Sequence, residues 1–335
     1  MRKEKFPESL QEAILYFSKY ENCHRFIVDL RWADGNVKCP RCCSERVTYL
    51  EKARVWKCYE KHSLAKFSLK IGTIFEDSPI GLDKWLAAVW MVVNCKNGIS
   101  SYEIGRSLDV TQKTAWFMDH RIRFALHQGS FDTKMGGEGS TVEADETYIG
   151  GKARNMHVAR RRAMGFLDRS KTGGFGKVAV FGLLERHGSG KTSKVRTKVI
   201  GKFDARAMKS EISAHVEKGS TVYTDEHGGY STLGENGDFV HDFVRHAETY
   251  VRGAVHTNGI ENFWSLLKRS IGGTYVSVEP FHMFRYLDEQ SFRFNERYGN
   301  DCDRFLSAMS GVMDKRLTYK VLTGKQEEQT ETGIN

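Results

Sequence analysis

The sequence has no run of 18 apolar, uncharged residues, which argues against a membrane-spanning helix. Its first residues, MRKEKFPESLQEA, also lack the apolar segment of a signal peptide. We therefore expect a cytoplasmic protein without a membrane partner. No internal repeat is visible, and 335 residues are enough for two or three domains, each with its own core.

Acidic residues are outnumbered by basic ones, 42 against 51, and the formal net charge is +9. An excess of positive charge favours a polyanionic partner, and nucleic acid is the leading candidate. Charge alone says nothing about the fold, and ribosomal and membrane-surface proteins are equally basic.

The seven cysteines do not form the spread-out pattern of a disulfide framework, because four of them fall between residues 39 and 58. Cys39 and Cys42 form a Cys-x2-Cys pair, and Cys58 and His62 follow after 15 intervening residues. This spacing predicts one structural Zn²⁺ held by these four side chains. Cys43 is an alternative to Cys42, and a redox role is the other possible use of the pair, although no thioredoxin-like pattern surrounds it. We assign no function to Cys23, Cys95 and Cys302.

The first 130 residues are mostly helical in pattern. Residues 8–30 predict one or two short amphipathic helices, and residues 81–94 predict a buried helix. Between 100 and 127 we expect two helices with a tight turn, the first starting at a capping box of Ser100 and Glu103. The apolar residues expected to face a core in the first segment are Leu10, Ile14, Leu15 and Phe17.

The helix pair at 100–127 has the spacing of a helix-turn-helix, with a turn at Asp109 and Val110 and a cap at Thr111. The second helix of such a motif lies in the major groove of DNA. A plain helical hairpin would have a similar pattern. The side chains that we expect to contact DNA are Gln112, Lys113, Arg121 and Arg123.

The pattern becomes strand-rich after a glycine-rich segment at 136–140, which reads as a linker. TVEADETYI, KVAVFGLLER and TSKVRTKVIG predict three strands, and Asp204 caps a helix that ends at Gly219. STVYTD predicts a fourth strand, FVRH a possible fifth, and residues 258–270 a helix with one buried stripe. This order is that of a ribonuclease-H-like mixed α/β fold.

Three acidic residues are the candidate catalytic groups: Asp145 and Asp225 at strand ends, and Glu261 on the late helix, with 35 residues between Asp225 and Glu261. In the predicted fold they converge on two divalent metal ions, Mg²⁺ or Mn²⁺, which prefer oxygen ligands and catalyse phosphodiester chemistry. Asn258 is an alternative third ligand, or the main one with Glu261 assisting. Lys268 shares their helix face and is expected to reach a DNA phosphate. Glu143, Glu146 and Glu226 are interpreted as structural or supporting residues.

Residues 152–177 contain eight Lys or Arg and one acid, Asp168. Such a run is commonly a solvated loop, but its position after the first catalytic strand favours contact with the DNA backbone. The candidates for backbone contact are Lys152, Arg154, Arg160, Arg161 and Arg162, together with Lys268 and Arg269 on the late helix.

A resemblance to a known family rests on CPRC, FSLKIGTIFEDSPI, the helix pair, EADETYIGG, VYTDEHGGY and the segment that begins HTNGIENFW. Together, over about residues 20–300, they resemble the zinc-ribbon transposases of bacterial insertion sequences, the ISXO-like group. Members of that group have Glu or Asn as the third site residue, and the wider pattern favours Glu261. One departure is that Cys58 and His62 replace the usual second Cys-x2-Cys.

The resemblance implies a DDE transposase that recognises the terminal inverted repeats of its element in double-stranded DNA. Metal-dependent cleavage at each end frees a 3′ hydroxyl, which attacks target DNA, so no small-molecule substrate is expected. It further implies a homodimer or higher oligomer, associated with the nucleoid when bound to DNA. The competing interpretations are a stand-alone nuclease, a DNA-binding regulator or inactive transposase relic, and a basic RNA-binding scaffold.

These patterns predict six segments along the chain. An N-terminal helical segment at 1–35 precedes the zinc ribbon at 36–78 and the helical DNA-binding region at 79–130. A linker at 131–140 leads to the catalytic domain at 141–310, and a tail follows at 311–335.

Overall fold

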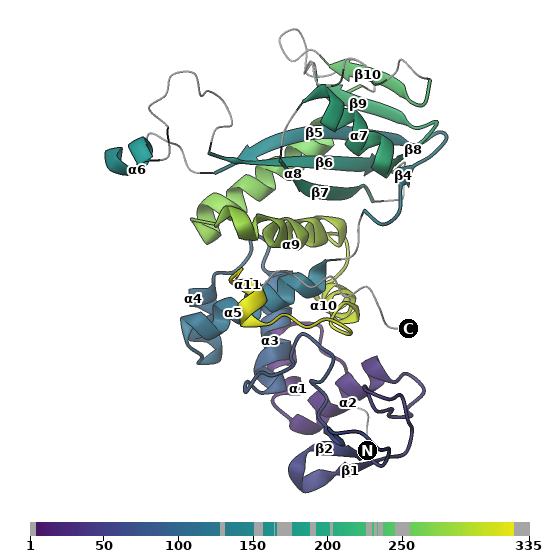
Figure 1. The fold of residues 1–335 in the computed structure, drawn as a ribbon, viewed down its shortest axis with the longest axis vertical. Coiled ribbons are helices and arrows are strands. Elements are labelled where there is room, and N and C mark those ends of the chain that lie inside the picture. Colours follow the sequence, from purple (N-terminus) through teal and green to yellow (C-terminus); the bar gives the residue numbers. More distant parts are fainter. Residues whose placement is uncertain are drawn as a thin grey trace. The chain divides into compact units, whose positions relative to one another are not determined.

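The computed structural model describes residues 5–127, 131–150, 157–163, 165, 176–187, 192–201, 204–225, 230, 233, 237–244 and 255–324. The chain folds into two compact units, one of Met1–Leu126 with Gly299–Asn335 and one of His127–Tyr298 (Figure 1). The first is called the N-terminal unit below and the second the sheet unit. This division differs from the predicted boundaries, because residues 299–310 belong to the N-terminal unit and residues 131–140 to the sheet unit.

The N-terminal unit begins with two short helices, α1 (Leu10–Phe17) and α2 (Tyr20–Arg31). Ser9 caps α1, and its hydroxyl accepts a hydrogen bond from the Glu12 amide at 3.3 Å. Phe17 is buried against the rings of Phe6, Phe26 and Phe305, which fixes the rotation of α1. The prediction that all four apolar residues of this segment face a core is therefore wrong for three of them, which are exposed: Leu10, Ile14 and Leu15.

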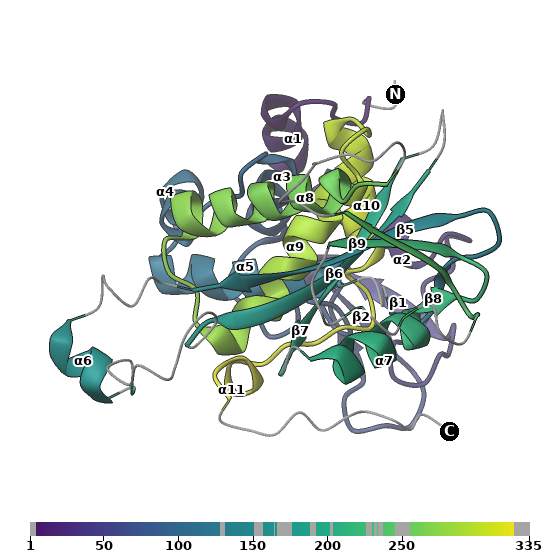
Figure 2. The same cartoon turned by 90° about the horizontal axis from the view of Figure 1, so that it is seen from above.

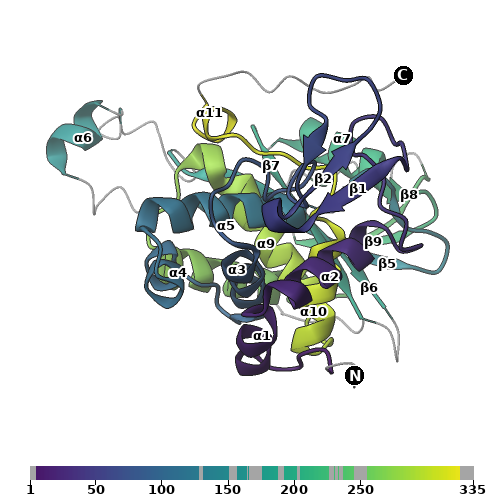
Figure 3. The ribbon, with the colours of Figure 1, turned by 90° about the horizontal axis from the view of Figure 1, so that it is seen from below.

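A three-stranded antiparallel sheet follows, formed by β1 (Val47–Leu50), β2 (Val55–Cys58) and β3 (Lys66–Phe67), with the 3-10 turn η1 (Glu51–Ala53) between the first two strands. Trp56 of β2 stacks on His24 of α2 and on Phe67 of β3. These contacts attach the small sheet to α2, which lies beside β1 and β2 in Figure 3.

The rest of this unit is helical. The buried helix α3 (Leu82–Asn94) packs against α1, α2 and α10 (Asp301–Ser310). The predicted capping box of Ser100 and Glu103 starts α4 (Ser101–Leu108), and Asp109 turns the chain in the left-handed conformation before α5 (Gln112–Leu126). The chain ends its described part in α11 (Tyr319–Leu322).

A five-stranded mixed sheet forms the centre of the sheet unit, with strand order β10-β9-β5-β6-β7. β5 (Thr141–Ile149), β6 (Val178–Arg186) and β7 (Lys194–Ile200) are antiparallel neighbours, whereas β9 (Thr221–Asp225) and β10 (Val240–Val244) extend the sheet in parallel from β5. The predicted fifth strand at FVRH is therefore present but starts three residues earlier, at Val240.

Helices cover both faces of this sheet (Figure 2). Phe181 and Leu183 face α7 (Ala205–His215), which begins at the predicted Asp204 cap. Val180 and Leu184 face the other way, toward α8 (Asn258–Arg269) and α9 (Met283–Asn295). α8 continues as a π-helical turn (Ser270–Tyr275), and a 3-10 turn (Pro280–His282) precedes α9.

The glycine-rich segment at 136–140 is not an isolated linker. Gly136 belongs to β4 (Met135–Gly136), which pairs in parallel with β8 (Val216–Glu217), and the Gly137 amide donates to Ser220 Oγ at 2.8 Å. A short helix, α6 (Val158–Ala163), lies between β5 and β6 in the sequence. Within the described residues, no helix is both long enough and apolar enough to span a membrane.

Candidate metal centres and nucleic-acid interface

Three carboxylates of the sheet unit form an acidic cluster: Asp145, Glu146 and Asp225 each offer an oxygen within 4.8 Å of the others. The sheet explains why the two aspartates meet. β5 and β9 are parallel neighbours whose last paired residues are Glu143 and Tyr223, so each aspartate lies two residues past the last pair. The predicted convergence of Asp145 and Asp225 is thus present in the structure.

Glu146 was predicted to be structural or supporting, yet it belongs to this acidic cluster. Successive side chains of a strand point to opposite faces, so Glu146 approaches the cluster from the α7 side of β5. Tyr230 is 1% exposed, and its hydroxyl donates a hydrogen bond to Glu146 Oε2 at 2.9 Å. Its position next to Asp145 was the only sequence signal for this role.

The surroundings of the acidic cluster disfavour negative charge. Burial raises the pKa of Asp145 to about 7, and the negative charge of Asp225 adds to the shift. Burial likewise raises the pKa of Glu146 to about 8, with Asp145 adding to it. A divalent cation offsets both the burial and the mutual repulsion, and an all-oxygen donor set suits a hard cation such as Mg²⁺. The residues present therefore fit a divalent metal, although they do not distinguish Mg²⁺ from Mn²⁺.

Glu261 lies in the first turn of α8, where Thr257 Oγ1 donates to its Oε1 at 2.9 Å. It is close enough that its charge contributes to the raised pKa of Asp145, but it is not among the three residues of the acidic cluster. Asn258, Lys268 and Arg269 are exposed on α8. The predicted apolar stripe is buried at Ile260, Phe263, Trp264 and Leu267, whereas its fifth member, Ile271, is half-buried in the π-helical turn. The role of Glu261 or Asn258 as a third ligand stays a prediction.

α8 is held against β5 by two acidic side chains. The buried Glu143 accepts from the Ile260 amide at 2.8 Å and forms an ion pair with Arg186, which agrees with the structural role expected for it. Asp145 Oδ2 accepts from the Trp264 indole at 2.9 Å, a contact that the sequence did not predict. Glu226 lies outside the described residues.

The four predicted zinc ligands, Cys39, Cys42, Cys58 and His62, also lie together, with one ligand atom of each within 4.8 Å of the others. The Cys42 and Cys58 sulfurs are 3.7 Å apart, and Cys39 Sγ is 3.6 Å from His62 Nε2. Zn–S bonds of about 2.3 Å and Zn–N bonds of about 2.0 Å in a tetrahedron give edges of about 3.8 and 3.6 Å. The donor set and its spacing therefore fit a structural zinc ion, and Cys43 is not needed.

The helix pair places its predicted DNA-contacting residues in two different environments. Lys113 is exposed at the start of α5, with its Nζ 5.2 Å from the ring centre of Tyr319, and Gln112 donates to Ser101 Oγ at 3.0 Å. Arg121 and Arg123 are only 4% and 1% exposed. The prediction that these two arginines contact DNA is therefore wrong, because segments from elsewhere in the unit cover this end of α5.

The basic run after β5 is described only in part. Arg162 is exposed on α6 and Arg161 is half-buried there. Lys152, Arg154 and the side chain of Arg160 lie outside the described residues, so the predicted backbone contacts of this run stay predictions.

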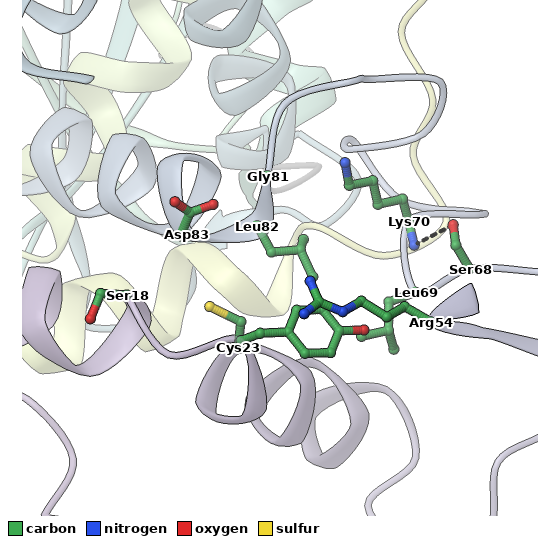
Figure 4. Close-up of a pocket in the computed structure, with 10 residues that line it drawn as sticks. Ser18, Cys23, Arg54, Ser68, Leu69, Lys70, Gly81, Leu82 and Asp83 are labelled. Atoms are coloured by element: carbon green, nitrogen blue, oxygen red, sulfur yellow. Dashed lines mark hydrogen bonds between the residues drawn. The ribbon is translucent and has the colours of Figure 1, made fainter. Parts of the chain in front are cut away.

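The N-terminal unit also contains a pocket of about 490 Å³ near the start of α3 (Figure 4). Its wall includes two basic residues that already have partners. Lys70 Nζ donates to the carbonyl of Ser78 at 2.9 Å, and the Arg54 guanidinium lies 3.9 Å from the ring centre of Tyr20.

Comparisons with known proteins point to one family. Residues 135–295 match the family model described as an ISXO2-like transposase domain, and residues 20–60 match a transposase zinc-ribbon domain. The chain is 30% identical over 248 residues to an uncharacterized protein in transposable element ISH50 of Halobacterium salinarum, an alignment that covers 72% of this chain and 80% of that protein. The first match contains the acidic cluster, and the second contains the three cysteine ligands.

Proposed function

Because the chain belongs to the ISXO2-like transposases, we propose that it binds the terminal inverted repeats of an insertion sequence, cleaves the DNA at the ends and joins the 3′ hydroxyls to target DNA. The observation that carries this proposal is the acidic cluster of Asp145, Glu146 and Asp225, which lies where β5 and β9 stop pairing, inside the matched domain. Pairs of Mg²⁺ ions at such sites activate an attacking hydroxyl and stabilise a leaving oxygen.

The sheet supports a ribonuclease-H-like catalytic domain. Three antiparallel strands, β5, β6 and β7, are extended from β5 by two parallel strands, β9 and β10, with helices on both faces. This arrangement puts the first and fourth strands of the sheet side by side, and each carries one aspartate two residues past the last pair between β5 and β9. We propose that these aspartates are the first two metal ligands and that Glu261, or Asn258 next to it, is the third protein ligand.

The protein's own groups have separate tasks in this proposal. The carboxylates of Asp145 and Asp225 would hold the divalent cations, which would supply the charge that binds and activates the scissile phosphate. Lys268 and Arg269, exposed on α8, bind phosphates of the DNA that passes over the helix. No protein side chain forms a covalent bond to DNA, because the 3′ hydroxyl is itself the nucleophile in strand transfer.

DNA recognition is proposed for the N-terminal unit. We propose that the zinc ribbon stabilises the sheet of β1, β2 and β3, and that α4 and α5 act as a helix-turn-helix. Gly105 supports a close approach of the two helices, because a Cβ there would lie 3.1 Å from the Val110 carbonyl oxygen. Lys113 at the start of α5 is the leading candidate for groove or phosphate contact, followed by Gln112, and exposed Arg162 is the leading described candidate of the basic run.

The decisive experiment incubates purified protein and Mg²⁺ with a duplex that ends in the element's terminal repeat, then separates nicked and strand-transferred products on a denaturing gel. We expect both products from the wild type and neither from Asp145→Asn. That variant should still bind the duplex with unchanged affinity. Full cleavage by Asp145→Asn would refute the catalytic assignment.

The same assay separates the alternatives. Nicking without strand transfer indicates a stand-alone nuclease, and binding without either product indicates a regulator or an inactive relic. Because two element ends must be cut and joined together, we further propose that the active form is a homodimer or a higher oligomer. Sedimentation of the complex with repeat DNA measures that state directly.

A further inference from the structure

Asp145 has a hydrogen-bond partner, Trp264, to which the proposed mechanism assigns no role. The indole of Trp264 is 4% exposed, and its Nε1 donates to Asp145 Oδ2 at 2.9 Å. Trp264 lies three residues after Glu261 on α8, so one helix contributes both this donor and a candidate ligand. An indole N–H is only a donor, so this contact engages one carboxylate oxygen and leaves Oδ1 for another partner.

The strand beside Asp145 is shaped to admit this ring. Gly182 of β6 pairs directly with Asp145 and therefore points to the same face of the sheet. A Cβ at Gly182 would lie 2.6 Å from Cη2 and from Cζ2 of Trp264, and 3.0 Å from Cδ1 of Ile260. No side chain larger than hydrogen fits there while the indole keeps its position. The glycine is thus required by space, since its backbone is not in the left-handed region.

We propose that Trp264 is a positioning residue for Asp145, and that Gly182 provides the slot from which its indole orients the carboxylate toward the metal ions. This inference rests on the proposed function of the acidic cluster. Groups that hydrogen-bond a metal ligand fix its orientation, and their loss typically weakens metal binding 10- to 100-fold. The N–H bond also favours the charged form of a carboxylate whose burial disfavours it.

Two variants remove the contact in different ways. Trp264→Phe deletes the N–H donor and keeps an aromatic ring, whereas Gly182→Ala keeps the donor and displaces the ring. Leu267→Ala is the matched control, because Leu267 is buried in the same apolar cluster on α8 but is not in the Asp145 contact. All three are expected to lower stability, so stability alone does not decide the matter.

The deciding measurement is a calorimetric titration of the zinc-loaded, full-length protein with Mn²⁺. We expect an affinity about 10-fold weaker in both Trp264→Phe and Gly182→Ala, and wild-type affinity in Leu267→Ala. Nicking of repeat DNA should need a correspondingly higher Mn²⁺ concentration in the first two variants. If Trp264→Phe does not fold, as judged by circular dichroism, Gly182→Ala decides the outcome.

Asp145→Asn separates the two possible failures. If Asp145→Asn binds Mn²⁺ as well as the wild type, the metal site of the proposed function is wrong. If that variant loses binding but Trp264→Phe and Gly182→Ala bind Mn²⁺ normally, the metal site stands and the positioning role of Trp264 is refuted. If Leu267→Ala weakens Mn²⁺ binding to the same degree, the effect comes from a general loss of packing, and the positioning role of Trp264 is again refuted.

Discussion

At the scale of single residues, Asp145 is held between opposing influences. Burial and the charge of Asp225 favour its neutral form, whereas the Trp264 indole and a backbone amide favour its charged form. The raised pKa of about 7 shows that burial and repulsion dominate when no cation compensates them. The site is therefore arranged for function at the expense of stability, as is common for active-site acids.

This balance predicts how stability depends on pH. A carboxylate with a pKa near 4 in the unfolded chain and about 7 in the folded protein destabilises the fold once it ionises. The penalty is absent below pH 4, grows as the pH rises and is complete above pH 7. We expect Asp145→Asn to raise the metal-free unfolding free energy by about 1 to 3 kcal/mol at pH 8 and much less at pH 5.

Urea denaturation at the two pH values measures this difference. Saturating Mg²⁺ should reduce or reverse the gain, because only the wild type then recovers free energy by binding the ion. Asp288→Asn is a suitable control, since Asp288 is a carboxylate of the same unit that pairs with His127 and is not a member of the acidic cluster. An equal gain for Asp145→Asn at both pH values would contradict the burial of a charged carboxylate.

The sequence was sufficient to find Asp145 and Asp225, because each follows a strand-like segment and precedes glycines. The prediction that both lie at strand ends holds for Asp225 but is wrong for Asp145, since β5 continues to Ile149. It was insufficient for Glu146 and Trp264. Strand alternation assigns Glu146 to the face opposite Asp145, and only the end of the β5–β9 pairing brings both carboxylates to Asp225. Trp264 reads as part of a buried stripe, and its polar contact depends on the missing side chain of Gly182 in a distant strand.

At the scale of elements, α5 shows where a local pattern fails. Its second half carries Arg121 and Arg123, which look exposed in a helix of mixed polarity. In the fold, Arg121 Nε donates to the Leu317 carbonyl at 3.1 Å, and its Nη1 donates to the carbonyls of Ile74 and Glu76 at 3.0 and 2.7 Å. The segments that cover Arg121 are about 45 and 196 residues from it in the sequence, so no pattern within α5 could predict its burial.

This arrangement predicts opposite effects for two basic residues of one helix. Arg121→Met leaves three carbonyls, two of them in buried hydrogen bonds, without their donor and should lower the unfolding free energy by about 3 kcal/mol. Lys113→Gln removes an exposed charge and should change stability by less than about 0.5 kcal/mol. In DNA binding, only Lys113→Gln should weaken affinity, and it should lower the slope of log K against log salt by about 1.

Chemical denaturation and salt-dependent fluorescence anisotropy, performed below the unfolding temperature of Arg121→Met, provide the two readouts. A reduced salt slope with unchanged stability in Arg121→Met would restore that arginine as a DNA ligand.

Elements with strong local signals were predicted well. The Ser100 capping box, the Asp204 cap, the apolar stripe of α8 and the strands β5, β6, β7 and β9 are all present, because neighbouring residues determine them.

At the scale of the whole chain, the sheet unit is inserted between two parts of the N-terminal unit. Residues 299–324 return to it: α10 packs on α3, and Lys315 Nζ donates to the carbonyls of Phe124 and Ala125 at the end of α5. The sequence assigned residues 299–310 to the catalytic domain, since an amphipathic helix does not reveal which core it joins. The order of elements in the sequence predicts the topology of the sheet, but it does not predict that the chain after residue 298 packs in the N-terminal unit.

The two units contain different candidate metal sites, and this predicts separate responses to metals. The zinc ligands belong to the N-terminal unit and the acidic cluster to the sheet unit. In scanning calorimetry, a zinc-selective chelator should lower one unfolding transition by on the order of 10 °C, because several kcal/mol of zinc binding are lost. Mg²⁺ at about 100 times its dissociation constant adds roughly 2.7 kcal/mol to the other unit, which should raise its transition by about 5 to 10 °C.

Two variants identify the transitions. Cys58→Ser should reproduce the effect of the chelator and leave the Mg²⁺ response unchanged, whereas Asp145→Asn should abolish the Mg²⁺ response and leave the chelator effect unchanged. A single transition that moves with either metal would mean that the two units unfold as one cooperative body. In that case a loss of zinc would weaken the catalytic sheet as well, and cleavage would fail whenever the ribbon is empty.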